Sequence, residues 1–76
     1  MKKINCGIKL GKYKHYKGNC YELIAIARHS ESPDELMAVY RALYEDGEVW
    51  VRPLRMWEEL VDVGGVAVKR FSYIGD

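Results

Sequence analysis

Three short turn sequences constrain the fold of this 76-residue chain more than any other feature. They are Gly18-Asn19, Asp46-Gly47 and Gly64-Gly65, and glycine, asparagine and aspartate all tolerate turn conformations. Asp46-Gly47 lies between two apolar segments, which is a strong signal for a β-hairpin. The sequence therefore predicts consecutive short strands joined by tight turns.

The segment before the first of these turns alternates as a strand does. Tyr13 and His15 fall on one side of residues 12–16, whereas Lys12, Lys14 and Tyr16 fall on the other. This period of two is typical of a half-buried strand. We expect Tyr13 and His15 to point inward.

Other segments have strand composition as well. Residues 21–28 contain a continuous apolar run, and residues 49–51 are β-branched and aromatic. Pro53 ends the latter strand because it has no amide to donate. We expect a short helical turn within residues 56–61 and a last strand at residues 69–74.

The segment from Ser32 to Tyr44 fits two structures. Ser32-Pro33-Asp34-Glu35 resembles the start of a helix. Four apolar residues then fall at helical spacing: Leu36, Val39, Tyr40 and Leu43. The hairpin signal at Asp46-Gly47 requires an extended first arm, however, so we predict a turn at residues 32–35 and a strand at Met37–Tyr44.

These segments indicate a mostly β fold, a small antiparallel SH3-like barrel of about five strands with one short helical turn before the last strand. Seventy-six residues allow one domain and little room for an enclosed active site. We assign residues 11–76 to the barrel and residues 1–10 to an N-terminal extension.

Cys6 and Cys20 are the only cysteines. No signal peptide or apolar run long enough for a membrane span accompanies them, so we expect free thiols, a cytoplasmic location and no membrane partner. A metal site would need more closely spaced ligands than the sequence supplies. We predict neither a metal nor another cofactor.

A two-residue loop at Asp46-Gly47 would set the register of the hairpin. It places Arg41 opposite Arg52 and Leu43 opposite Trp50. One face would then form the core, with these residues: Tyr40, Ala42, Tyr44, Val49 and Val51. On the other face, Trp50 would lie between the two arginines as a stacking platform. Alternatively, Trp50 packs against the barrel and Arg52 pairs with a glutamate.

Several motifs in fixed order resemble a known family. They are Tyr13–Gly18, Tyr21, Ala27–Glu31, Tyr40–Tyr44, Trp50–Pro53, Met56, Gly65 and Arg70-Phe71. Together they closely resemble the bacterial domain-of-unknown-function family 1653, from Gly11 onward. Lys69 stands where that family leads us to expect proline, and Trp57 where phenylalanine is usual. The resemblance implies a small, soluble, mostly β bacterial domain and no established activity.

Two stretches carry the candidate binding residues. Residues 11–21 combine three tyrosines, three lysines and a histidine without any acid, a chemistry suited to anionic or planar partners. Arg28-His29-Ser30-Glu31 follows a strand, where it either caps a turn or contacts a ligand. With the hairpin residues, the predicted ligand-binding set is Tyr16, Lys17, Arg28, His29, Trp50 and Arg52.

Two classes of function fit this set. The first is a non-enzymatic binding module for an anionic or planar ligand, such as a nucleic acid, a nucleotide or a peptide. The second is a small enzyme, or an accessory domain of one, in which His15 or His29 acts as a general base. The sequence does not identify the partner; a nucleic acid and another protein are the two candidates.

Overall fold

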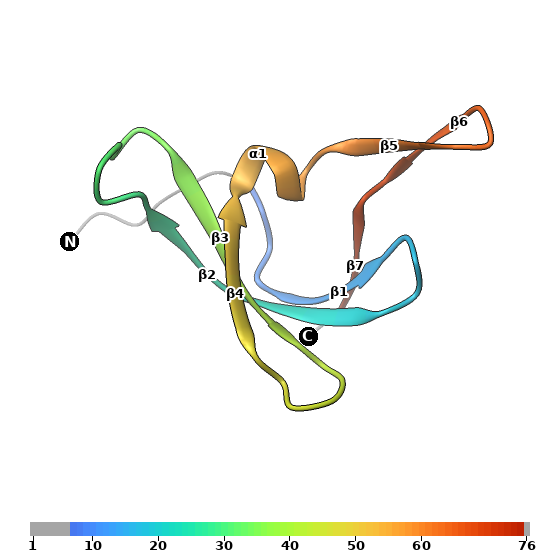
Figure 1. Cartoon of the computed structure of the whole chain (residues 1–76), viewed down its shortest axis with the longest axis horizontal. Helices are drawn as coiled ribbons and strands as arrows, with labels where there is room; N and C mark the ends of the chain where they lie inside the picture. Colours follow the sequence, from blue (N-terminus) through green and yellow to red (C-terminus); the bar gives the residue numbers. More distant parts are fainter. Residues whose placement is uncertain (1–6, 76) are drawn as a thin grey trace.

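The structure is a computed structural model that describes residues 7–75 (Figure 1). Five strands form one antiparallel sheet in the order β4-β3-β2-β1-β7. Their bounds are β1 (Gly11–His15), β2 (Cys20–Arg28), β3 (Leu36–Ala42), β4 (Val49–Pro53) and β7 (Phe71–Gly75). Along the chain, β4 is followed by helix α1 (Leu54–Trp57). A second, two-stranded sheet of β5 (Leu60–Val63) and β6 (Val66–Lys69) then precedes β7.

The predicted class is confirmed, since the chain is mostly β and antiparallel, with one short helix before the last strand. The sheet is open, because the outer strands β4 and β7 do not pair with each other in the described part of the chain. Helix α1 provides a side-chain contact between them instead. It follows β4 directly, and its Trp57 stacks on Phe71 of β7 with ring centroids 3.7 Å apart.

The core lies on one face of the sheet, which we call the inner face. Its buried residues come from four strands and the helix: Tyr13, Leu23, Ala38, Tyr40, Leu54, Trp57 and Phe71. The rings of this core meet in several geometries: Tyr13 meets Trp57 edge to face, whereas Tyr40 is tilted against Trp57. Tyr13 is buried and Lys12 and Lys14 are exposed, as the alternation of residues 12–16 predicts.

The choice of strand over helix for Met37–Tyr44 is confirmed, because β3 occupies Leu36–Ala42. The preceding Ser32–Glu35 segment is a turn, in which the Glu35 amide donates to the Ser32 carbonyl at 2.8 Å. Side chains of β3 alternate between the buried inner positions of Ala38, Tyr40 and Ala42 and less buried outer positions. The helical spacing of its apolar residues was therefore coincidental.

The predicted hairpin register is wrong. Tyr40 lies opposite Trp50 and Ala38 opposite Arg52, so Arg41 faces Val49 and not Arg52. The loop is longer than two residues because the Ala42 amide bonds the Glu48 carbonyl, which leaves residues 43–48 outside the ladder.

Contacts of Tyr44 and its neighbour Leu43 with β2 explain why the loop is longer than two residues. The Tyr44 hydroxyl lies 2.7 Å from the Tyr21 hydroxyl of β2, and the neighbouring Leu43 amide bonds the Cys20 carbonyl. These two contacts hold the chain against β2 and away from β4. A tertiary contact thus overrides the local turn signal.

The shift in register changes the core face that the sequence predicts. Tyr40 and Ala42 are buried as expected, but Tyr44 is exposed in the loop. Val49 and Val51 point to the outer face of the sheet and are 57% and 60% exposed. The shift is by three positions, and any odd shift moves every side chain of a strand to the other face.

The C-terminal part differs from the prediction in detail. The helical turn occupies Leu54–Trp57 and not residues 56–61, because it starts directly after Pro53. Gly64-Gly65 is a turn as predicted, with both glycines at positive φ, but it joins β5 to β6 in a hairpin that the sequence analysis missed. This hairpin projects from the main sheet (Figure 1). The predicted last strand is split between β6 and β7.

Cys20 is a free thiol, whereas Cys6 lies outside the described residues. None of the helical segments described is long and apolar enough to cross a membrane.

Candidate functional site

The six predicted binding residues lie in three places. Tyr16 and Lys17 follow β1, near the first residue of β2, whereas Arg28 and His29 lie at its other end. Nine strand residues span about 26 Å, so these two pairs are far apart. Trp50 and Arg52 lie on the inner face of β4, opposite Tyr40 and Ala38.

Arg28 and His29 stabilise their own loop. Arg28 donates to the Pro33 carbonyl, and Nδ1 of His29 accepts the amides of Glu31 and Ser32 at 3.0 and 3.2 Å. These hydrogen bonds agree with the alternative in which the segment caps a turn. The acceptor in this turn is the histidine ring.

Trp50 is 52% exposed and is not enclosed by other side chains. It borders a small hollow of about 160 Å³ that the hairpin loop forms. Three carboxylates also line this hollow, those of Glu45, Asp46 and Glu48. Such surroundings disfavour an anion at Trp50.

A basic groove lies between the projecting hairpin and the β1–β7 part of the sheet. Its volume is about 380 Å³. It is lined by Lys14, His15, Tyr16, Val63, Val68, Lys69, Ser72 and Ile74. Two lysines, an aromatic ring and apolar side chains are present, and no carboxylate of residues 7–75 lines the groove. This combination suits an anion that carries a planar or apolar part.

Backbone hydrogen bonds fix the groove residues of β1. A tight turn follows the strand, in which the Gly18 amide bonds the His15 carbonyl and the His15 amide bonds the Asn19 carbonyl. The Tyr16 amide donates to the Arg70 carbonyl at 2.9 Å, which attaches this turn to the start of β7. As a result, Arg70 is held beside His15 and Tyr16 although it is far from both in sequence.

His15 contacts both the groove and the core. The centroid of its ring lies 4.6 Å from the ring centroid of Tyr16 and 4.9 Å from that of Phe71. Burial lowers the pKa of His15 below the usual 6.5, and the positive charges of Arg70, Arg52 and Lys17 lower it further. All three charges that act on this pKa are positive, so the region favours an anion over a cation.

Arg52 supplies a charge on the core side of His15. Its guanidinium lies over the rings of Tyr40 and Phe71, 5.6 and 5.5 Å from their centroids, and its Nε donates to the Tyr40 hydroxyl. No carboxylate of residues 7–75 pairs with it, whereas Arg70 pairs with Glu59 at 2.7 Å. The charge of Arg52 is therefore not neutralised by a described acid.

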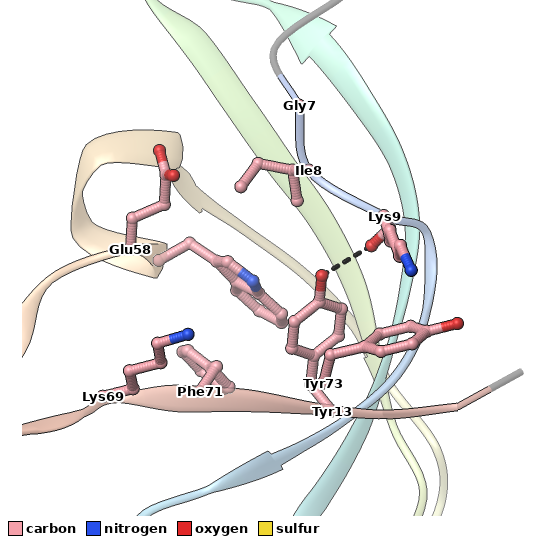
Figure 2. A pocket seen from close by; sticks show the side chains of 9 residues that line it. Gly7, Ile8, Lys9, Tyr13, Glu58, Lys69, Phe71 and Tyr73 are labelled. Carbon is pink, nitrogen blue, oxygen red and sulfur yellow. Dashed lines mark hydrogen bonds between the residues drawn. The ribbon is translucent and has the colours of Figure 1, made fainter.

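A second hollow of about 390 Å³ lies beside Gly7 (Figure 2). Aromatic rings line it, including those of Tyr13, Phe71 and Tyr73, and the Tyr13 hydroxyl donates to the Lys9 carbonyl at 2.6 Å. Glu58 and Lys69 also line it. Because the carboxylate of Glu58 lies in this hollow as well as lysines, the hollow attracts an anion less strongly than the basic groove does.

Both histidines considered as general bases use Nδ1 to accept a backbone amide. His15 accepts the Lys17 amide at 3.2 Å, and His29 accepts two amides. A neutral imidazole that accepts at Nδ1 carries its proton on Nε2. Neither ring, in this arrangement, has a free lone pair for taking a proton from a substrate.

Lys14 and Lys69 line the groove but are not in the set that the sequence predicts, and Arg70 lies beside the groove through its hydrogen bond with Tyr16. The one local signal was the pair Lys69-Arg70 before Phe71, a basic dipeptide in a mostly acidic part of the chain. Its distance from Tyr16 in sequence conceals the contact, which depends on the pairing of β1 with β7.

The fold and the groove define a small, mostly β antiparallel domain with a basic, aromatic-lined surface. Residues 11–73 match the family described as "Protein of unknown function (DUF1653)", and the chain belongs to this family. A crystal structure of a DUF1653 protein from Bordetella bronchiseptica is similar, with 38% sequence identity and a TM-score of 0.82. The similarity covers 91% of this chain and 90% of that one. The comparison with curated proteins finds no match.

Proposed function

We propose that this domain is a non-enzymatic binding module for an anionic ligand with planar groups, and that single-stranded nucleic acid is the ligand class that fits it best. The observation that carries the proposal is the basic groove, in which Lys14, Lys69 and Tyr16 lie beside apolar side chains and none of the described carboxylates takes part in the lining.

Each part of the groove matches a part of such a ligand. Phosphates are held by lysine charges, and bases stack on exposed rings such as that of Tyr16. Lys17 adds positive charge nearby, since it acts on His15, whereas Arg70 is paired with Glu59. Of the predicted set, Tyr16, Lys17 and Arg52 contribute to this region, whereas Arg28, His29 and Trp50 lie elsewhere.

The enzyme alternative has less support. It needs His15 or His29 to take up a proton, and both rings use Nδ1 in turn hydrogen bonds. The groove also contains no second ionisable group positioned as an acid, since its other charged residues are lysines.

The test is the binding of a fluorescent short oligothymidylate, followed by anisotropy across a salt series. We expect affinity to fall with salt, with a log–log slope of roughly −0.7 for each phosphate neutralised. The double variant Lys14→Glu/Lys69→Glu should bind at least about tenfold more weakly, because it reverses two charges that line the groove.

The matched control is Arg28→Glu, which also reverses a charge but lies at the far end of β2. It should bind nearly as the parent does. Absence of binding at low ionic strength would reject the nucleic-acid proposal, and an equal loss in Arg28→Glu would place the binding surface elsewhere. Circular dichroism of each variant checks that it is folded.

A further inference from the structure

Strand β4 presents an open edge to solvent. It is an outer strand of the main sheet, and among the described strands it pairs with β3 alone. Three successive apolar residues of this strand are more than half exposed: Val49 by 57%, Trp50 by 52% and Val51 by 60%. An exposed apolar edge strand is a template for pairing with another extended chain.

The backbone groups of Val49 and Val51 point to this edge. The Ala42 amide bonds the Glu48 carbonyl, and in an antiparallel ladder the pairs that exchange hydrogen bonds alternate with pairs that do not. Trp50 therefore bonds β3, whereas the N–H and C=O groups of the two valines are directed away from it. None of the described residues bonds these outward groups. The open edge of β4 thus keeps unused hydrogen-bonding capacity beside apolar side chains.

Charges of opposite sign mark the two ends of this edge. At its start, the carboxylates of Glu45, Asp46 and Glu48 line the small hollow beside Trp50, and none of them forms an ion pair with a described residue. At its other end, Arg52 has no acid partner among residues 7–75. A strand that pairs antiparallel with β4 runs in the opposite direction. It is therefore complementary in charge when an acid precedes a base along its sequence.

We propose that the open edge of β4 binds an extended segment of a partner protein as an additional antiparallel strand, with an acidic residue opposite Arg52 and a basic residue opposite Glu48. Strand addition of this kind takes its affinity from main-chain hydrogen bonds and its specificity from alternate side chains. The partner residues opposite Val49 and Val51 exchange the backbone hydrogen bonds, and their side chains lie beside those valines. These two partner residues are therefore apolar.

The size of the edge selects this occupant. Strand β4 has five residues, and a strand of this length spans roughly 17 Å. Such an edge buries too little surface for a stable interface between two folded domains, which needs about 1,000 Å². An extended segment needs only the edge and the hollow beside it. None of the β4 residues lines the basic groove, so the proposal does not depend on the nucleic-acid ligand.

NMR titration of the isotope-labelled full chain with the blocked peptide acetyl-Glu-Val-Thr-Val-Lys-amide tests the edge. Paired antiparallel with β4, this peptide places its glutamate opposite Arg52 and its lysine opposite Glu48. We expect saturable shifts of the Val49 and Val51 amide signals, because both amides gain an acceptor. The affinity should be roughly millimolar, since a short flexible peptide loses conformational freedom on binding.

Two altered peptides separate the backbone contribution from the charge contribution. Methylation of the amide nitrogen of the peptide valine opposite Val51 removes one hydrogen-bond donor and should weaken binding at least about tenfold. The reversed sequence, acetyl-Lys-Val-Thr-Val-Glu-amide, keeps the composition but places like charges opposite each other. It should bind at least about fivefold more weakly than the first peptide.

A pair of protein variants tests the position. Glu48→Lys should weaken binding of the first peptide, whereas Asp62→Lys, which changes an exposed acid of the projecting hairpin, should keep the parental affinity. No saturable shift in β4, equal binding of either altered peptide, or equal loss in Asp62→Lys would each overturn the proposal. Shifts of the same amides that depend on protein concentration without peptide would also overturn it, and would assign the edge to a second copy of the chain.

Discussion

His15 is positioned between the core and the basic groove. Nδ1 accepts the Lys17 amide, while the ring contacts Tyr16 on one side and Phe71 on the other. Protonation of this ring would place a further positive charge beside Arg70, Arg52 and Lys17. The neutral form is therefore the one that the fold favours.

This preference makes stability depend on pH. The folded-state pKa of His15 lies below its usual 6.5, so the unfolded chain binds the proton more readily. The contribution of His15 to the free energy of unfolding is constant above about 6.5, the pKa of this histidine in the unfolded chain. The free energy of unfolding falls as the pH decreases below that value. Chemical denaturation at a series of pH values should show this loss, and His15→Gln should show a smaller one.

The comparison of His15→Gln with the parent isolates the contribution of this ring, because every other titratable group is the same in the two proteins. If His15→Gln and the parent lose stability equally between neutral and mildly acidic pH, the electrostatic account of His15 is wrong.

Tyr21 is a second residue whose ionisation is suppressed. Burial, and then its hydrogen bond with Tyr44, raises the pKa of Tyr21 to about 12. Its hydroxyl therefore stays protonated at physiological pH and keeps the contact that holds the β3–β4 loop against β2.

At the level of elements, helix α1 depends entirely on tertiary contacts. Four residues are far fewer than an isolated helix needs in water, so its formation follows from packing of the buried Leu54 and Trp57. Trp57 is 2% exposed, stacks on Phe71 and contacts Tyr13 and Tyr40. The single ring thus joins the helix to three strands.

We expect Trp57→Ala to lower the free energy of unfolding by about 3–5 kcal/mol, because a large buried ring leaves a cavity. Trp50→Ala provides the matched control, since Trp50 is the same residue type but is half exposed, and its cost should stay below about 1 kcal/mol. Urea denaturation followed by circular dichroism measures both. Similar costs for the two variants would contradict the core assignment.

The β3–β4 hairpin shows how far the sequence can predict an element. Strand propensity and the Asp46-Gly47 signal correctly predict two antiparallel strands around residue 46. They do not predict the register, because the contact between Tyr44 and Tyr21 lengthens the loop. Propensity describes the local chain, whereas register here depends on a third strand.

For the whole molecule, the basic groove lies between two parts that are distant in sequence, the projecting hairpin of β5 and β6 and the β1–β7 part of the sheet. Lys14 comes from β1 and Lys69 from β6, so the groove forms only when both parts are in place.

The sequence by itself determined the fold class, the positions of most strands and the family. Each of these depends on local information: alternation of apolar residues, turn dipeptides and motifs in fixed order. The inward direction of Tyr13 followed from the same period, because successive side chains of a strand alternate between faces whatever the strand pairs with.

Only the tertiary structure decided which residues share a surface. The pairing of β1 with β7 brings Tyr16 beside Arg70, and the position of the projecting hairpin adds Lys69 and Val68 to the basic groove. The register of β4 turned Val51 outward. These arrangements depend on contacts between strands distant in sequence, and a one-dimensional pattern does not encode the offset at which two such strands pair.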